Sequence, residues 1–418
     1  MSQFNYREGK MHCEQVALDE IAAEVGTPFY AYSRKMLTDH YTAFDQGFAS
    51  APHIVAYAVK ANGSLGVVAT LARLGAGADV VSAGELYRAL KAGVDPQRIV
   101  YSGVGKTAEE MAYALRAGIL MFNVESVEEL EALNNVAAEV GKPAPVALRI
   151  NPDVDPKTHK YISTGLKENK FGIDIAIAEQ AYARAGELPN IRVIGLDCHI
   201  GSQLTQLGPV QDAVTRMANL IVALRADGHA IEFLDVGGGL GIVYSREHPP
   251  APTEYAQVVL DAVKDLGVTL IMEPGRFIAG NAGALVTKVL YRKTNGEKRF
   301  IIIDAAMNDL LRPSLYDSFH EIKPVAEHSE SGSPADIVGP ICETGDFLAR
   351  NREFPEVDQG ELLAVLSAGA YGFSMASTYN ARPKCAEVLV DGDKFHVIRR
   401  RETFEDLIEH ETIPTGVV

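Results

Sequence analysis

Short apolar runs alternate with longer amphipathic stretches between about residues 50 and 280. Each run ends in a polar or glycine-containing turn, and the next stretch repeats its apolar residues at helical spacing, as in Glu109–Ala117 and Val127–Val140. Because strands that alternate with helices form parallel sheets, eight such runs favour a closed (β/α)8 barrel over an open sheet. The predicted strands are Ile54–Val59, Ala78–Ser82, Ile99–Ser102, Leu120–Val124, Val146–Asn151, Gly195–His199, Phe233–Val236 and Leu270–Glu273.

The pattern changes after about residue 284, where short apolar segments follow one another without long helical stretches between them. We expect a second, mostly β domain there, with Thr27–Tyr32 as a candidate for a further strand of it. Phe319–Pro340 is polar and rich in proline and glycine, which predicts a loop, and Thr403–Glu409 predicts a short helix. The expected domains are a barrel at 36–284 and a β domain formed by 1–35 and 285–418. The other predicted strands are Val286–Arg292, Phe300–Asp304, Leu362–Leu366, Ala386–Val390 and Lys394–Arg400.

Composition narrows the class of protein. The chain has 418 residues, of which 47% are hydrophobic and 22% charged, as expected of a globular protein with more than one core. Its formal net charge of -16 argues against partners such as nucleic acid or an anionic membrane surface. No apolar run is long enough for a membrane span, and the polar N-terminus does not look like a signal peptide. The cysteines, which lack metal-ligand spacing, predict a reduced, cytoplasmic protein without a metal site; they are Cys13, Cys198, Cys342 and Cys385.

Polar residues gather where the predicted strands end, which is the face on which barrel enzymes carry their chemistry. Lys60 ends the first apolar run, and burial would lower its pKa and favour the nucleophilic amine that a Schiff base requires. The alternative is a lysine that has reached the solvated rim of the sheet. The polar residues at these ends are Lys60, Asp79, Asn151, His199, the Gly237–Gly239 turn and Glu273.

Three of these strand ends continue into motifs. In Asp235–Gly241, consecutive glycines would let backbone amides converge on a phosphate, or would only make a tight turn. In Ile271–Arg276, a glutamate precedes a glycine and an arginine, which suits anion binding or a simple Glu–Arg ion pair. In Asp197–Gln203, alternation would direct Asp197 and His199 to the same side, although a lone histidine is more often structural.

The β domain contains further candidates. Asp309–Tyr316 places an arginine and a tyrosine four residues apart, and Ile341–Asp346 places Cys342 beside Glu343 in a polar turn. Cys342 could be an inert core cysteine, which is the commoner case for this residue, and Gly369–Gly372, which holds Tyr371, could be merely a turn.

Together these segments resemble the fold-type III pyridoxal-phosphate enzymes, which include alanine racemase and the basic amino-acid decarboxylases. Within that group the chain is similar to the diaminopimelate decarboxylase family. The resemblance covers most of the chain, and its motifs are in the family's order. They are Ala58–Asn62, Tyr161–Gly172, His199–Gln203, Glu273–Arg276, Arg312–Tyr316 and Cys342–Asp346.

The resemblance implies a pyridoxal 5'-phosphate site in the barrel. Lys60 would form the Schiff base with the cofactor, near Asp79, and His199 would stack on one face of its ring. Glu273 would pair with the pyridine nitrogen, and Tyr371 would contact both cofactor and substrate. The phosphate would be held by Ser202, the turn that contains Gly238 and Gly239, and the amides of Gly275 and Arg276.

The resemblance also implies how the substrate is held. Arg276, Arg312 and Tyr316 would bind a substrate carboxylate, and Glu343 would bind the distal ammonium. Cys342 would donate a proton, reaching in from the second subunit of a homodimer. The implied reaction is decarboxylation of meso-2,6-diaminopimelate to L-lysine and CO2, the last step of lysine biosynthesis.

Other functions remain open at this point. Ornithine, arginine or carboxynorspermidine are alternative substrates, although Glu343 points away from the ornithine and arginine enzymes, which tend to carry aspartate after the cysteine. A racemase would be expected to place an arginine, not Glu273, at the pyridine nitrogen. A non-catalytic relative would have little reason to retain both Lys60 and Cys342.

Overall fold

The computed structural model describes residues 2–155, 169–329 and 332–416. The chain divides into two compact units, one formed by residues 37–278 and the other by residues 1–36 together with 279–418. Residues 161–168 of the predicted Tyr161–Gly172 motif lie outside the described part of the chain.

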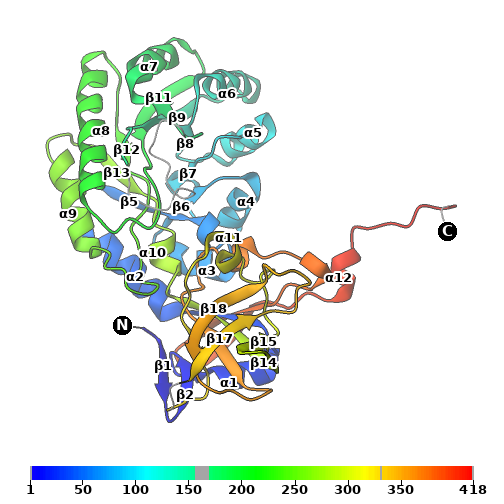
Figure 1. Ribbon diagram of the computed structural model, residues 1–418. Coiled ribbons are helices and arrows are strands. Elements are labelled where there is room, and N and C mark those ends of the chain that lie inside the picture. Colours follow the sequence, from blue (N-terminus) through cyan, green and yellow to red (C-terminus); the bar gives the residue numbers. More distant parts are fainter. Residues whose placement is uncertain (1, 156–168, 330–331, 417–418) are drawn as a thin grey trace. The chain divides into compact units, whose positions relative to one another are not determined.

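Residues 37–278 contain a closed ring of parallel strands, in the order β5, β6, β7, β8, β9, β11, β12, β13 and back to β5 (Figure 1). This ring confirms the predicted (β/α)8 barrel. A short strand of two residues, β10 (Ile173–Asp174), pairs with β9 outside the ring. The ring strands are β5 (His53–Ala58), β6 (Gly77–Val80), β7 (Ile99–Tyr101), β8 (Met121–Val124), β9 (Ala144–Asn151), β11 (Ile191–Asp197), β12 (Phe233–Asp235) and β13 (Thr269–Met272).

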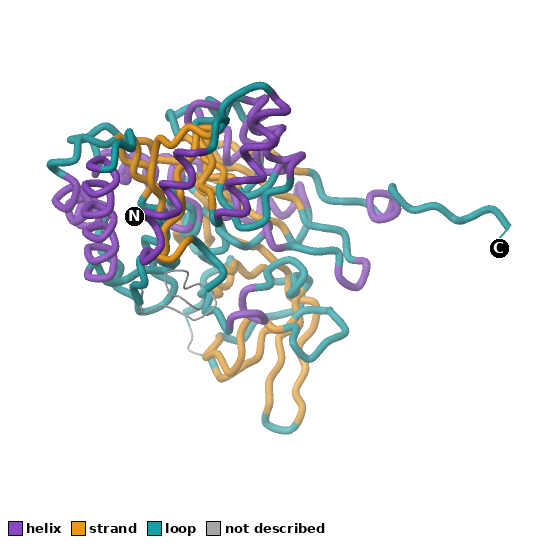
Figure 2. Tube along the Cα trace, turned by 90° about the horizontal axis from the view of Figure 1, so that it is seen from above, coloured by secondary structure: helices purple, strands orange, loops and turns teal. Residues whose placement is uncertain are grey.

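Helices surround the strands of the ring, as the tube in Figure 2 also shows. Several begin where the sequence supplies a cap: the hydroxyls of Ser82, Thr107 and Ser126 each accept a hydrogen bond from the amide three residues later. The helices are α2 (Arg34–Gly47), α3 (Leu65–Ala72), α4 (Ala83–Lys91), α5 (Ala108–Ala117), α6 (Val127–Val140), α7 (Ala178–Glu187), α8 (Gly208–Ala226), α9 (Pro252–Val263) and α10 (Arg276–Ala279).

Six of the eight predicted strands end one or two residues earlier in the structure, and two of these ends bear on the site. β5 ends at Ala58, so Lys60 lies in a short 3-10 turn over Val59–Ala61 and not in the strand itself. β11 ends at Asp197, so His199 lies in the following loop. In both cases the chain leaves the ladder once its backbone turns out of the barrel, which an apolar run in the sequence does not reveal.

The interior of the barrel is apolar along most of its length and polar at the carboxyl ends of the strands. Side chains from successive strands fill the apolar part, because bulky residues on alternate strands interdigitate in a closed barrel. The buried cluster comprises Ile54, Ala56, Val100, Met121, Ala147, Ile194 and Ile271.

The other unit is built mainly from β-strands, as predicted. Its large sheet has the path β18, β17, β15, β14, β4, β20, β21, with β16 and β19 joined beside β14. The early strand β4 pairs with β14 and β20, so the predicted strand near Thr27–Tyr32 does join this domain. The strands are β4 (Phe29–Ser33), β14 (Gly283–Asn295), β15 (Lys298–Ile303), β16 (Ile322–Pro324), β17 (Ser333–Val338), β18 (Phe347–Phe354), β19 (Leu362–Val365), β20 (Ala386–Asp391) and β21 (Lys394–Arg399).

The prediction that Phe319–Pro340 is a loop is wrong, since β16 and β17 lie within it. β17 is a strand because β15 and β18 pair with it on either side, and these partners outweigh its weak local propensity. The remaining elements of this unit are β1 (Phe4–Arg7), β2 (Lys10–Cys13), β3 (Val16–Ala17), α1 (Leu18–Val25), α11 (Arg312–Tyr316) and α12 (Phe404–Ile408).

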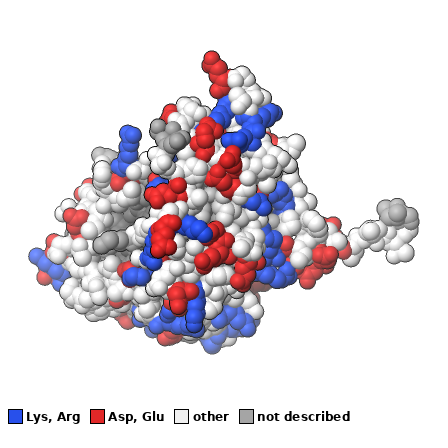
Figure 3. All heavy atoms as spheres, turned by 90° about the horizontal axis from the view of Figure 1, so that it is seen from below, with Lys and Arg blue, Asp and Glu red and all other residues white. Residues whose placement is uncertain are grey.

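Acidic and basic side chains are interspersed over the face shown in Figure 3. Among the described residues, no helix combines the length and the apolar composition that crossing a bilayer requires.

Candidate active site

Lys60 is paired with a carboxylate inside the barrel. Its Nζ donates to Oδ2 of Asp79, which lies on β6 and is fully buried, whereas the Lys60 side chain is 37% exposed. A buried carboxylate is costly unless it is paired, so Asp79 holds the ammonium over the mouth of the barrel. This contact distinguishes Lys60 from a lysine that merely reaches the outer rim of the sheet.

Glu273 follows β13 at the same mouth and is only 7% exposed. Its Oε1 accepts hydrogen bonds from Ser102 Oγ at 3.3 Å and from Asn123 Nδ2 at 3.5 Å. Burial, with the nearby charge of Asp79, raises the pKa of Glu273 to about 7, against the opposing effect of Lys60. The carboxyl group can therefore hold or release a proton near neutral pH.

A polar network supports Glu273 from within the barrel. Asn123 Nδ2 also donates to Asp235 Oδ2 at 3.1 Å, and Arg149 lies 3.9 Å from Asp197 while donating to Glu125 at 2.8 Å. Burial, followed by the charge of Glu273, raises the pKa values of Asp197 and Asp235 well above the ordinary range.

Sequence reasoning missed Asn123, Arg149 and the role of Asp235. Asn123 and Arg149 lie in buried strands, where apolar residues are expected. A polar residue in an otherwise apolar strand was therefore the signal in the sequence that could have identified them.

His199 contacts the glycine turn directly. Its Nδ1 accepts a hydrogen bond from the amide of Gly238 at 3.1 Å, which assigns the ring proton to Nε2. Burial lowers the pKa of His199 well below its usual value, and the charges of Arg149 and Lys60 lower it further. The site thus contains a neutral, flat imidazole ring.

The glycine turn after β12 packs tightly against its neighbours. A Cβ on Gly238 would overlap the carbonyl oxygen of Glu273, and one on Gly239 would lie 2.5 Å from the carbonyl oxygen of Gly201. Gly275 is similarly confined, since a Cβ there would lie 2.9 Å from that of Ala61. Crowding alone therefore requires these glycines.

Arg276 joins the loops that follow three different strands. Its guanidinium donates to Tyr244 Oη at 2.7 Å and to Ser202 Oγ at 3.1 Å, and the residue is 7% exposed. Two of the residues predicted from sequence, Ser202 and Arg276, are thus in direct contact, and Tyr244 is an addition that the sequence did not indicate. A buried guanidinium held by hydroxyl groups is suited to binding an anion.

The remaining predicted residues belong to the β unit. The turn Cys342–Asp346 lies beside α11, because Ser314 Oγ donates to the carbonyl oxygen of Gly345 at 2.6 Å. This contact brings the helix that carries Arg312 and Tyr316 next to Cys342 and Glu343. Cys342 is exposed, unlike the other cysteines, which excludes an inert core role.

Arg312 and Tyr371 are each held in a defined conformation. Arg312 is 6% exposed, and its guanidinium contacts His320 Nε2 at 3.1 Å and Ser318 Oγ at 3.3 Å. Tyr371 has a φ of 55°, in the left-handed region that is unusual for a tyrosine. The predicted site residues thus form two groups, one in the barrel and one in the β unit.

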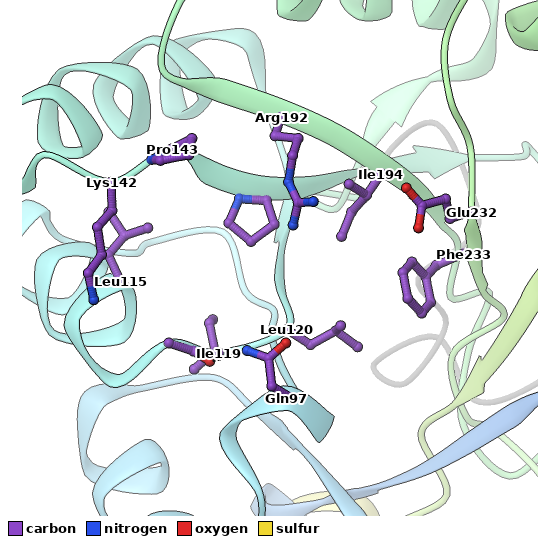
Figure 4. Close-up of a pocket in the computed structure, with 12 residues that line it drawn as sticks. Gln97, Leu115, Ile119, Leu120, Lys142, Pro143, Arg192, Ile194, Glu232 and Phe233 are labelled. Carbon is purple, nitrogen blue, oxygen red and sulfur yellow. Dashed lines mark hydrogen bonds between the residues drawn. The ribbon is translucent and has the colours of Figure 1, made fainter.

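A separate cavity of about 340 Å³ lies at the amino ends of the barrel strands (Figure 4). Its floor is apolar, with Ile194, Leu120 and Phe233, and its charged side chains, which include Arg192 and Glu232, are exposed. None of the predicted site residues lines it, and the amino end of a barrel usually serves stability.

Comparison with known proteins assigns the family. Residues 34–280 match the family model of the pyridoxal-dependent decarboxylase, pyridoxal binding domain. The chain is 54% identical to a diaminopimelate decarboxylase from Vibrio cholerae and 53% identical to one from Pseudomonas aeruginosa, with 99% of each chain covered in both cases.

Solved structures agree with this assignment. A diaminopimelate decarboxylase from M. jannaschii in complex with L-lysine matches with a TM-score of 0.95 at 38% identity, covering 100% of both chains. One from Helicobacter pylori, also complexed with L-lysine, matches with a TM-score of 0.91 at 44% identity, covering 94% of this chain and 99% of that chain. The chain therefore belongs to the pyridoxal-dependent decarboxylases and, among them, to the diaminopimelate decarboxylase family.

Proposed function

We propose that this protein decarboxylates meso-2,6-diaminopimelate to L-lysine and CO2, the last step of lysine biosynthesis, with pyridoxal 5'-phosphate as its cofactor. The observation that carries the proposal is the barrel mouth, where Lys60 pairs with a buried carboxylate close to Glu273. The full-length similarity to diaminopimelate decarboxylases, two of them with L-lysine bound, supports an amino-acid substrate.

The barrel residues fit this cofactor. Lys60 provides an amine for covalent attachment, oriented by Asp79. His199 provides a neutral flat ring that can stack on the pyridine ring. The close-packed glycine turns at Gly238, Gly239 and Gly275 would hold the phosphate, with Ser202 and Arg276 as further donors.

When bound, the cofactor supplies an electron sink for the electron pair that remains when CO2 leaves. Glu273 would hold a proton at the pyridine nitrogen, and its pKa of about 7 suits a group that shares a proton at neutral pH. Asp235 and Asn123 orient Glu273 from inside the barrel. This arrangement favours decarboxylation over racemisation, in which an arginine would be expected at the same place.

The β unit would recognise the substrate. Arg312 and Tyr316, with Arg276 of the barrel, would bind a carboxylate of the substrate, and Glu343 would bind its distal ammonium. Tyr371 would contact both cofactor and substrate. Cys342 would deliver the proton that replaces CO2, since its thiol is exposed in a polar turn.

We also propose a homodimer in which Cys342 and Glu343 of one subunit complete the site of the other. The support is that both lie on the surface of the single chain, although their proposed roles require contact with a substrate. Four unpaired cysteines are in keeping with the cytoplasm.

Release of CO2 tests the function. Purified protein supplied with pyridoxal 5'-phosphate should release CO2 from meso-2,6-diaminopimelate at least about 100-fold faster than from ornithine, arginine or lysine, because a site with paired polar groups rejects analogues that leave them unpaired. Faster release from ornithine or arginine would replace the proposed substrate with that amino acid, which was the alternative from sequence.

A further inference from the structure

A surface loop of the β unit, residues 377–381, makes two contacts with the Cys342–Asp346 turn. Tyr379 Oη donates to Glu343 Oε2 at 2.8 Å, and Asn380 Oδ1 accepts a hydrogen bond from the backbone amide of Cys342 at 2.8 Å. Neighbouring side chains of one loop thus bind Cys342, the proposed proton donor, and Glu343, the proposed partner of the distal ammonium.

The Cys342–Asp346 turn is anchored at its other end by Asp346. This buried carboxylate accepts hydrogen bonds from the amides of Ile341 and Met307, each at 2.7 Å. The loop that carries Tyr379 is attached to the same segment, since the amide of Ser377 donates to the carbonyl oxygen of Asn308 at 2.9 Å. One stretch, Met307–Asn308, therefore fixes both the turn and the loop that reaches over it.

The backbone of the loop is unusual. Asn380 and Ala381 both have positive φ angles, 56° and 52°, which residues other than glycine and asparagine seldom adopt. Such conformations cost free energy and persist where the surrounding structure requires them. Here the left-handed turn directs Asn380 toward the Cys342 amide.

Stability of the single chain does not explain these contacts. Tyr379, Asn380, Cys342 and Glu343 are all exposed, and water competes for exposed hydrogen-bonding groups, so such bonds contribute little to folding. What the contacts do is fix orientation. Tyr379 occupies Oε2 of Glu343, and within the described residues no hydrogen bond engages Oε1.

The geometry also keeps Oε1 accessible. A Cβ at position 345 would lie 3.1 Å from Glu343 Oε1, so Gly345 leaves room beside this oxygen. The hydrogen bond to Glu343 raises the pKa of the Tyr379 phenol, which therefore stays a proton donor at neutral pH.

We infer that Tyr379 and Asn380 are positioning residues for this reaction: Tyr379 orients the Glu343 carboxylate so that Oε1 meets the distal ammonium of the substrate, and Asn380 holds the backbone that presents the Cys342 thiol. This inference rests on the proposed function. Tyr379 would act on substrate recognition through Glu343, and Asn380 would act on proton delivery through Cys342. The two effects have separate kinetic signatures.

The test compares kcat and KM for CO2 release from meso-2,6-diaminopimelate. Tyr379→Phe should raise KM about 3- to 10-fold while kcat stays within about twofold, because only the hydrogen bond to Glu343 is lost. The matched control is Tyr291→Phe, since Tyr291 is a 60% exposed tyrosine in the same unit. Equal KM values for these two variants would overturn the role of Tyr379.

Asn380→Gly removes the acceptor and tolerates the positive φ, so it should lower kcat about 10-fold with little change in KM. Asn380→Asp keeps an acceptor oxygen and should restore most of kcat. A kcat loss in both variants, or in neither, would overturn the role of Asn380. The Tm and the cofactor absorbance of each variant must match those of the wild type. If a variant loses activity together with thermal stability or bound cofactor, the residue has only a structural role.

The wild-type protein separates this inference from the proposed function. If it releases no CO2 from diaminopimelate, the proposed function fails and the inference fails with it. If it is active and Tyr379→Phe behaves like Tyr291→Phe, the function stands and the role of Tyr379 is wrong.

Discussion

Five buried acidic residues share the interior of the barrel mouth with Arg149 and Lys60; they are Asp79, Glu125, Asp197, Asp235 and Glu273. These acids cannot all be ionised at once, because each negative charge raises the cost of the next in a poorly solvated space. The pKa values of Asp197, Asp235 and Glu273 are raised accordingly. The protonation of Glu273 is therefore set by its neighbours as well as by its own burial.

The raised pKa of Glu273 predicts a pH-dependent effect on stability. Glu273 binds its proton more tightly in the folded protein, with a pKa of about 7, than in the unfolded chain, where the value is the ordinary 4.5. Its contribution to the free energy of unfolding is thus greatest below the unfolded pKa and is lost as pH rises to about 7. For cofactor-free protein, the Tm of Glu273→Gln minus that of the wild type should become more positive between pH 5 and pH 8.

The matched control for this measurement is an exposed glutamate, such as Glu128→Gln on α6. It should show no such trend over the same pH range. A Tm difference for Glu273→Gln that stays constant or falls with pH would contradict the raised pKa.

At the scale of elements, the site depends on how closely three loops approach one another. Gly239, after β12, lies against Gly201 after β11, and Gly238 lies against the carbonyl group of Glu273 after β13, while Gly275 packs on Ala58 and Ala61 at the end of β5. The amide of Glu273 also donates to the carbonyl oxygen of Gly237 at 2.8 Å, which fixes the turn after β12 against the end of β13. The glycines thus determine the shape of the proposed phosphate site and the position of Glu273 together.

Gly238→Ala should disrupt this arrangement. Its Cβ would overlap the Glu273 carbonyl oxygen, and relief of such overpacking typically costs about 1–3 kcal/mol. We expect a lower Tm and at least about 10-fold weaker binding of pyridoxal 5'-phosphate, measured by absorbance titration, because Glu273 and the turn must move apart. Gly208→Ala, at the open start of α8, is the control and should leave both quantities unchanged. Normal cofactor affinity in Gly238→Ala would show that the turn does not form part of the cofactor site.

At the scale of the whole molecule, the chain carries its proposed chemistry in two separate units. Most of the proposed cofactor residues lie in 37–278, whereas the proposed substrate and proton-transfer residues Arg312, Tyr316, Cys342 and Glu343, with Tyr371, lie in the unit formed by 1–36 and 279–418. A dimer with two-fold symmetry would build two identical sites, each from the barrel of one subunit and Cys342 of the other.

Mixing two inactive variants tests this arrangement. Lys60→Ala and Cys342→Ala should each lose most activity alone. After subunit exchange in equal amounts, half of the dimers are mixed and each mixed dimer has one intact site, so about a quarter of wild-type activity should return. If exchange is demonstrated with tagged subunits and no activity returns, the sites are not shared.

Much of the fold followed from the sequence. The alternation of apolar runs with amphipathic stretches predicted the barrel, because strand and helix periodicities are local properties. The prediction of a loop at Phe319–Pro340 was wrong. β17 forms a strand because it pairs with β15 and β18, and this pairing cannot be read from the residues of β17 alone. For the same reason the strand ends near Lys60 and His199 moved by one or two residues.

The sequence by itself determined which residue types stand at the strand ends and in the motifs, and hence the cofactor class and family that it resembles. Only the tertiary structure decided which of them meet. The network of Asn123, Asp235 and Arg149 beneath Glu273 exists because closure of the ring brings β8, β9, β12 and β13 together around one interior. The contact of Tyr379 with Glu343 likewise joins residues 36 positions apart. Proximity of this kind depends on strand register and loop path, which are properties of the folded chain and not of any local segment.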